Sequence, residues 1–304
     1  MADERSPSAA AAEQPELIAD YQCHTGEGPL WHPSERRLYW ADIPTGRMFR
    51  YDPDTGKHEQ FYDGDVVGGF TIQADGSLLL FMAGGRVASW RDGELTNIID
   101  ELPGEEGNRF NDVIADPAGR VFCGTMPLQS DKGGEMAGSL YRLDTEGSMT
   151  TVLSGLGISN GMGFTPDLQG MYFTDTVTRK ISHFDYDEST GRITDQRVVV
   201  ETPEGEGVGP DGMTVDVEGH LWSARYDGGA LYRYSSGDEE ERRIDFPTAK
   251  KVTSVIFAGD GYTDMYVTTG GGQDRAANGS ESGGLFRLRP GVAGLPEFPS
   301  RVGL

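Results

Sequence analysis

Apolar and polar positions along the chain follow one pattern that returns six times. Each copy has a small or polar residue, a short apolar run, a turn with Asp, Pro or Gly, and a second apolar run. The copies are GPLWHPSERRLYWAD from Gly28, GGFTIQADGSLLLFM from Gly68, NDVIADPAGRVFCGT from Asn111, NGMGFTPDLQGMYFTD from Asn160, DGMTVDVEGHLWSA from Asp211 and TSVIFAGDGYTDMYVTT from Thr253. Apolar and polar residues that alternate around turn residues predict two hairpin-linked strands in each copy.

A second pattern trails each copy by about 20 residues and predicts a third strand. It reads GRMFRYD from Gly46, GRVASWRD from Gly85, GSLYRLD from Gly138, RKISHFDYD from Arg179, GALYRYS from Gly229 and GLFRLR from Gly284. A fourth strand follows in most units, as in HEQFY, MTTVL and RVVVE. Six repeated four-stranded units are typical of an all-β fold, the six-bladed β-propeller. A β-sandwich array would account poorly for the constant period.

The last unit runs into Pro-rich sequence without a clear fourth strand of its own. The run ELIADY, residues 16–21, is left over at the other end of the chain and could supply that strand. A propeller closed in this way has no exposed sheet edge at its seam. We therefore predict a disordered N-terminal tail over residues 1–15 and a single propeller domain over residues 16–304, closed by the N-terminal strand.

Charge and composition narrow the class of protein. The chain has 49 acidic and 26 basic residues, a net charge of −23, and only five of the bases are Lys. This balance argues against nucleic acid and anionic membranes as partners, and it is typical of a halophile's protein, where salt screens the repulsion. Two cysteines make no disulfide framework, and no apolar stretch is long enough for a membrane span or a signal peptide. We expect a cytoplasmic location.

The six equivalent positions of the repeats suggest where chemistry occurs. They are Glu27, Gly68, Asn111, Asn160, Asp211 and Thr253. In a propeller the first strand of each blade lines the axis, so these positions should meet at one mouth of the channel. Four of them carry oxygen side chains, two of them carboxylates, and such a set suits a hard divalent cation. The alternative is that Asn and Asp stand there only because they favour turns.

Two other motifs have a structural explanation. GISNG, residues 157–161, matches the G-x-S-x-G pattern of a serine hydrolase, but the sequence after Ser159 continues as a hairpin instead of the helix that this motif requires. DYDES, residues 185–189, begins like a calcium-binding loop but lacks its Gly and its final Glu, so we interpret it as a hairpin turn.

At these residues the sequence resembles the gluconolactonase and regucalcin (senescence marker protein) family of six-bladed propellers. The resemblance rests on GEGPLW, RFNDVIADPAGRVFCGTM, ISNGM, FDYDESTGRI, PDGMTVDVEGHLW, YTDMYVTT and GGLFRL. It implies one divalent metal ion held by Glu27, Asn160 and Asp211, and a substrate bound by Arg109 and Asn111. Some members carry a substrate-binding Glu shortly after GTM, where this chain has Gln129. This departure leaves the identity of the sugar open.

The resemblance implies metal-dependent hydrolysis of a sugar lactone, such as a glucono-, xylono- or arabinonolactone, to the aldonic acid. Asp211 is best placed to accept a proton as well as to bind the metal, which could be Ca²⁺, Zn²⁺, Mn²⁺, Mg²⁺ or Fe²⁺. The segment 128–137, rich in Gly and charge, is expected to form a loop over the mouth. The alternatives are another metal-dependent ester or phosphoester hydrolase, or a calcium-binding propeller without enzymatic activity. The sequence does not predict the oligomeric state.

Overall fold

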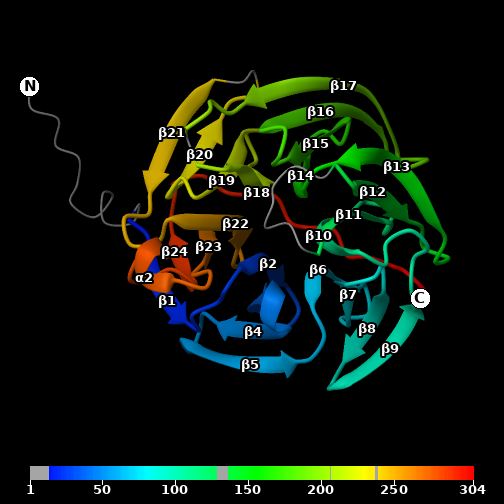
Figure 1. Ribbon diagram of the computed structural model, residues 1–304, viewed down its shortest axis with the longest axis horizontal. Helices are drawn as coiled ribbons and strands as arrows, with labels where there is room; N and C mark the ends of the chain where they lie inside the picture. Colours follow the sequence, from blue (N-terminus) through cyan, green and yellow to red (C-terminus); the bar gives the residue numbers. More distant parts are fainter. Residues whose placement is uncertain (1–13, 129–135, 206, 237–238) are drawn as a thin grey trace, which may run out of the picture.

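The computed structural model describes residues 14–128, 136–205, 207–236 and 239–304. Six four-stranded antiparallel sheets are arranged in a ring around a central axis, and the chain visits them in order (Figure 1). The predicted six-bladed propeller is confirmed. The predicted tail falls almost entirely on residues that the structure does not describe.

Blades 1 to 5 each use four consecutive strands, running from the axis outwards. Blade 1 contains β2 (Gly26–His32), β3 (Arg37–Asp42), β4 (Arg47–Asp52) and β5 (Lys57–Asp63), and blade 2 contains β6 (Val67–Ile72), β7 (Leu78–Met82), β8 (Val87–Arg91) and β9 (Glu94–Ile99). Blade 3 contains β10 (Asn108–Ala115), β11 (Val121–Pro127), β12 (Gly138–Leu143) and β13 (Met149–Leu156), and blade 4 contains β14 (Ser159–Phe164), β15 (Gly170–Asp175), β16 (Lys180–Asp187) and β17 (Arg192–Glu201). Blade 5 contains β18 (Gly209–Val215), β19 (Leu221–Tyr226), β20 (Ala230–Tyr234) and β21 (Glu240–Asp245).

Blade 6 joins the two ends of the propeller. It contains β22 (Lys251–Ala258), β23 (Asp264–Gly270), β24 (Gly284–Leu288) and, outermost, β1 (Glu16–Asp20). Leu17 pairs with Phe286, and the Ala19 side chain is buried in the core between blades 6 and 1. The closure by the N-terminal strand is therefore confirmed.

The apolar core lies between adjacent blades. Trp222 of blade 5, for example, packs edge-on against Phe257 of blade 6, with 6.2 Å between the ring centroids. Both cysteines, Cys23 and Cys123, are buried in this core as free thiols. The only helical segments that the structure gives within its described ranges are η1 (Ile43–Thr45) and α2 (Arg275–Asn278). No helix in those ranges is long and apolar enough to cross a membrane.

Residues 289–304 form no fourth strand; they run across one face of the propeller, drawn in red in Figure 1. Their backbone is hydrogen-bonded to several blades in turn. The donor and acceptor pairs are Gly294 N to Tyr262 O, Val217 N to Ala293 O, Ser300 N to Ile72 O and Arg301 N to Gly119 O. These partners lie where the innermost strands end, so the C-terminal segment covers the channel end opposite to the predicted mouth.

Candidate metal and substrate site

Each innermost strand carries a β-bulge close to its start. The pairing with the next strand shifts between Glu27 and Leu30, Val67 and Gly69, Phe110 and Val113, Asn160 and Met162, Pro210 and Met213, and Val252 and Ser254. These shifts coincide with the six positions that the repeats align. A bulge bends the strand and redirects side chains that would otherwise alternate between its two faces. The same backbone irregularity therefore shapes the mouth in all six blades.

Two of the six positions, Gly68 and Thr253, carry no carboxylate or amide group, and both lie at contacts between adjacent blades. A Cβ atom at Gly68 would lie only 1.8 Å from the Phe110 carbonyl oxygen, so glycine is required for blade 3 to approach blade 2. The Thr253 hydroxyl donates a 2.5 Å hydrogen bond to the Gly26 carbonyl oxygen and thereby connects blade 6 to blade 1.

The two asparagines of the mouth are fixed by one hydrogen-bond network. Asn111 donates its Nδ2 to Asn160 Oδ1 at 3.1 Å and to the Ser159 carbonyl oxygen at 2.9 Å. Asn160 donates its own Nδ2 to Thr176 Oγ1 at 2.9 Å, and Thr176 Oγ1 donates to the Pro210 carbonyl oxygen at 2.8 Å. The Asn160 amide therefore has one defined orientation, with its nitrogen committed to Thr176.

Glu27 and Asp211 are buried at the mouth, 3% and 4% exposed. The pKa of Glu27 is raised well above its ordinary value, first by burial and then by the negative charges of Asp211 and Asp112. Burial and the charge of Asp112 raise the pKa of Asp211 in the same way. These shifts show that the mouth brings carboxylates close together with too little positive charge to balance them.

Asp112 is a third acidic group of the mouth, and sequence reasoning missed it. Burial raises its pKa to about 7, although the Arg109 guanidinium acts in the opposite direction. Strict alternation along a strand would point the side chains of Asn111 and Asp112 to opposite faces. The bulge in β10 instead places both residues opposite Gly124. No local signal in the sequence marks that bulge.

Arg109 is the positive group that faces these carboxylates. Its Nη1 donates to Asn111 Oδ1 at 2.6 Å and to the Phe110 carbonyl oxygen at 2.9 Å. Burial lowers its pKa to about 10, even though Glu27, Asp112 and Asp211 favour the charged form. At neutral pH Arg109 therefore stays charged, and one guanidinium faces three carboxyl groups. The carboxylate and amide oxygens of Glu27, Asn160 and Asp211 fit a hard divalent cation, which would supply the missing charge.

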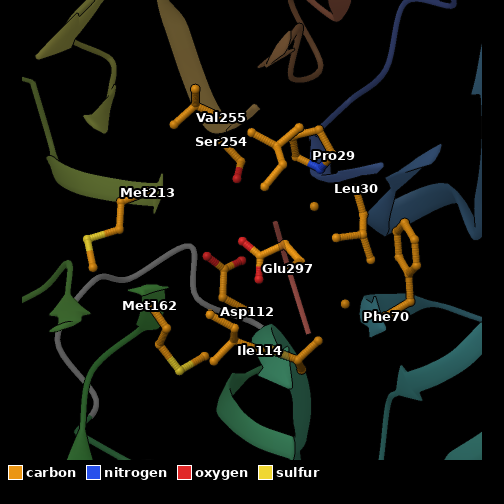
Figure 2. Close-up of a pocket in the computed structure, with 14 residues that line it drawn as sticks. Pro29, Leu30, Phe70, Asp112, Ile114, Met162, Met213, Ser254, Val255 and Glu297 are labelled. Atoms are coloured by element: carbon orange, nitrogen blue, oxygen red, sulfur yellow. The ribbon is translucent and has the colours of Figure 1, made fainter. Parts of the chain in front are cut away.

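A cavity of about 60 Å³ lies within the central channel. Most of the residues that line it are apolar, and the polar side chains of Asp112, Ser254 and Glu297 point into it (Figure 2). Glu297 comes from the C-terminal segment, and burial raises its pKa to about 7. Two carboxyl groups therefore face the channel. Asp112 comes from a strand of the mouth, and Glu297 comes from the C-terminal segment.

The predicted substrate residue Gln129 lies outside the described residues, as does most of the predicted loop 128–137. The two ends of this predicted loop, Leu128 and Ala137, are hydrogen-bonded to residues at or just before the start of β10. Leu128 donates its backbone N–H to the Gly107 carbonyl oxygen at 3.0 Å, and Asn108 donates its Nδ2 to the Ala137 carbonyl oxygen at 3.1 Å. Both ends of the segment are therefore hydrogen-bonded to residues that stand one or two positions before Arg109.

A second acidic group lies away from the mouth, at the hairpin turn between β18 and β19. Asp216, Glu218 and His220 could together offer ligand atoms to a metal ion. The Arg233 guanidinium already forms ion pairs there, with its Nη2 2.7 Å from Asp216 Oδ2 and 2.5 Å from Glu218 Oε2. The Arg233 guanidinium therefore already neutralises part of this acidic group, whereas in the described part of the chain the carboxylates of the mouth face Arg109 alone.

The two motifs that sequence analysis set aside are structural. Ser159 begins β14, and its buried hydroxyl donates to the Ser139 carbonyl oxygen at 3.2 Å, which is no arrangement for a nucleophile on a strand-to-helix turn. Residues 185–189 lie at the hairpin between β16 and β17, where Asp187 Oδ1 accepts a 3.0 Å hydrogen bond from the Ser189 N–H. Both interpretations are confirmed.

Comparison with known proteins gives consistent results. The family model described as "SMP-30/Gluconolactonase/LRE-like region" matches residues 25–271. Pentonolactonase XacC of Haloferax volcanii is 51% identical over 94% of this chain and 98% of its own length, and regucalcin of Bos taurus is 32% identical over 93% and 97%. Among solved structures, a luciferin-regenerating enzyme superposes with a TM-score of 0.86 at 28% identity, over 95% of this chain and 100% of its own.

Proposed function

The chain belongs to the SMP-30/gluconolactonase/LRE-like family, and on that premise we propose that it is a metal-dependent lactonase that opens a sugar lactone to the aldonic acid. The observation that carries the proposal is the meeting of Glu27, Asn160 and Asp211 with Arg109 and Asn111 at one mouth of the channel. The 51% identity with a pentonolactonase favours a pentonolactone as the first substrate to test.

Lactone hydrolysis adds water across a ring ester bond. The water oxygen bonds to the carbonyl carbon, the ring oxygen leaves as a hydroxyl group, and the acid formed releases a proton. A divalent cation held by Glu27, Asn160 and Asp211 would polarise the carbonyl group and make water easier to deprotonate. Asp211 accepts the proton of the attacking water and returns a proton to the leaving ring oxygen.

Arg109 and Asn111 have different tasks in this proposal. Both Nδ2–H groups of Asn111 are already donated within the protein, so this residue mainly orients Asn160 and Arg109. Arg109 commits Nη1 to the protein, whereas Nε and Nη2 make no hydrogen bond or ion pair with the described part of the chain. These two donors form the planar fork that suits hydroxyl groups of a lactone or the carboxylate of the product.

Acid release from a panel of sugar lactones, measured in concentrated KCl with and without a chelator, tests the proposal. We expect hydrolysis that stops when metal is removed and returns when metal is added. Absence of hydrolysis for every lactone would exclude the function, and hydrolysis that survives complete metal removal would exclude the role of the metal.

Substitution of Asp211 separates its two roles. Asp211→Asn keeps an oxygen for the metal but cannot accept a proton, so some metal should remain while kcat falls by roughly 10²–10⁴-fold. Glu27→Ala, Asn160→Ala and Asp211→Ala should each lose both metal and turnover, whereas Arg109→Ala should keep the metal. Metal content by elemental analysis and the rate of acid release are measured on the same preparations. A near-normal rate in Asp211→Asn would show that another group takes the proton.

A further inference from the structure

Tyr226 and Lys251 form a pair between blades 5 and 6. Tyr226 ends β19, Lys251 begins β22, and the Lys251 Nζ lies over the Tyr226 ring, 5.2 Å from its centroid. Gly272 is adjacent: a Cβ atom there would lie 3.1 Å from Lys251 Nζ, so glycine leaves the space that the ammonium group needs. Two blades therefore bring these side chains together, and neither strand would do so alone.

The polar ends of the pair are uncommitted. In the ranges that the structure describes, the Tyr226 hydroxyl makes no hydrogen bond and Lys251 Nζ has no carboxylate within 4.0 Å. Lys250, next in sequence, does have an acidic neighbour, since its Nζ lies 4.0 Å from Asp227 Oδ1.

Register places the pair at the rim of the mouth. Tyr226 pairs with Gly209 of β18, two residues before Asp211, and Lys251 stands two residues before Thr253 in β22. The charges of Asp211 and Glu27 reach the Tyr226 phenol and, after burial itself, contribute to raising its pKa. Arg109 belongs to blade 3, and β10 and β22 lie on opposite sides of the axis (Figure 1). An extended ligand at the mouth can therefore meet Arg109 at one end and this pair at the other.

We propose that Tyr226 and Lys251 form a second subsite, which binds the exocyclic hydroxyl-bearing end of the lactone while its ester group lies at Glu27, Asn160 and Asp211. The subsite rests on the proposed function and specifies it further. A phenol can donate to and accept from a sugar hydroxyl, and an ammonium group donates only. Together they give a polyol two complementary partners. The subsite selects lactones that carry a hydroxymethyl group or a longer polyol on the ring.

Two matched lactones test the subsite. A pentono-1,4-lactone carries an exocyclic hydroxymethyl group, and a tetrono-1,4-lactone has the same ring without it. Tyr226→Phe should lower kcat/KM for the pentonolactone by roughly 3–10-fold, the value of one neutral hydrogen bond. Lys251→Met should lower it by roughly 10–100-fold, the value of a hydrogen bond to a charged donor. Neither variant should change kcat/KM for the tetronolactone.

Two control variants separate the subsite from general damage. Tyr234→Phe removes a buried hydroxyl of the same blade, which accepts a 2.6 Å hydrogen bond from Arg225, and Lys250→Met removes the neighbouring ammonium group. Both should leave the ratio of the two kcat/KM values unchanged. The proposal is overturned if Tyr226→Phe and Lys251→Met leave this ratio as it is in the wild type, or if they lower both values equally.

Binding of ring ethers decides the subsite independently of catalysis. A 1,4-anhydropentitol and 1,4-anhydroerythritol share the ring of the two lactones but have no ester bond. Calorimetry should show that Tyr226→Phe and Lys251→Met weaken binding of the anhydropentitol alone. If the wild type hydrolysed no lactone, the proposed function would fail, and this titration would still support or overturn the subsite. Equal weakening for both ethers, or none, would overturn it.

Discussion

Replacement of Thr176 by Val tests how the mouth holds its proposed metal ligand. Val has the shape of Thr without its hydroxyl, and Thr176 is 3% exposed. The substitution removes the bond from Asn160 Nδ2 at 2.9 Å and the bond to the Pro210 carbonyl oxygen at 2.8 Å. It therefore leaves one buried donor and one buried acceptor without these partners.

Each buried polar group that loses its partner costs about 1–3 kcal/mol. Because a freed amide can rotate and a neighbouring group can adjust, we expect Thr176→Val to lower the free energy of unfolding by about 2–4 kcal/mol in total. The Asn160 amide would also lose one of the hydrogen bonds that fix its orientation, while the bond from Asn111 Nδ2 to its oxygen would remain. Loss of a group that orients a metal ligand typically weakens metal binding by about 10–100-fold.

Thr174→Val is the matched control, since Thr174 lies two residues earlier on the same blade and is fully buried. Its hydroxyl contacts only the Met213 sulfur, at 3.8 Å, among the side-chain hydrogen bonds of the described residues. Removing so weak a bond should cost less than about 1 kcal/mol and leave metal affinity unchanged.

The assay combines denaturant unfolding of the metal-free proteins in concentrated KCl with calorimetric titration of the divalent cation. Thr176→Val should be the less stable and the weaker metal binder of the two variants. Wild-type metal affinity in Thr176→Val would refute the reasoning, because either Thr176 would not orient Asn160 or Asn160 would not bind the metal.

Three further predictions concern the whole fold. Deletion of residues 1–14 should leave the melting temperature unchanged. Deletion of residues 1–22 removes β1 and leaves β24 as an unpaired edge, so this deletion should lower the melting temperature. Equal melting curves for the two truncated proteins would contradict closure by β1. Glu297 has a folded pKa of about 7 against an ordinary value of 4.5, so the native state keeps a proton that the unfolded chain releases, and the free energy of unfolding should fall as pH rises from about 4.5 to about 7. Glu297→Gln should lose this part of the slope, and identical slopes in both proteins would show that the carboxyl group is not buried in its neutral form. With a net charge of −23, the fold should melt at a higher temperature in about 2 M KCl than in dilute buffer, and an unchanged circular-dichroism melt would argue against adaptation to salt.

The candidate site was predicted in part. The six aligned positions do lie at one mouth, because their residues repeat at the same point of each hairpin, and the resemblance drew attention to Arg109 next to them. The roles of Glu27, Asn160 and Asp211 in metal binding remain predictions. Asp112, Thr176 and the Tyr226–Lys251 pair were not anticipated. Thr176 follows a strand as many threonines do, and only its contacts with Asn160 and Pro210 give it a role.

The sequence by itself determined the number of blades, the order of the strands and the closing role of residues 16–20. These features are written in short stretches of chain, since alternation and turn residues act over a few neighbours, and the repeats multiply the signal six times. The tertiary structure alone decided the bulge that turns Asp112 into the mouth, the pairing of Tyr226 with Lys251 across two blades, and the path of the C-terminal segment, where the Ser300 hydroxyl bonds to that of Thr71, 229 residues away. Such contacts depend on register and on packing between blades, and no local pattern encodes either of them.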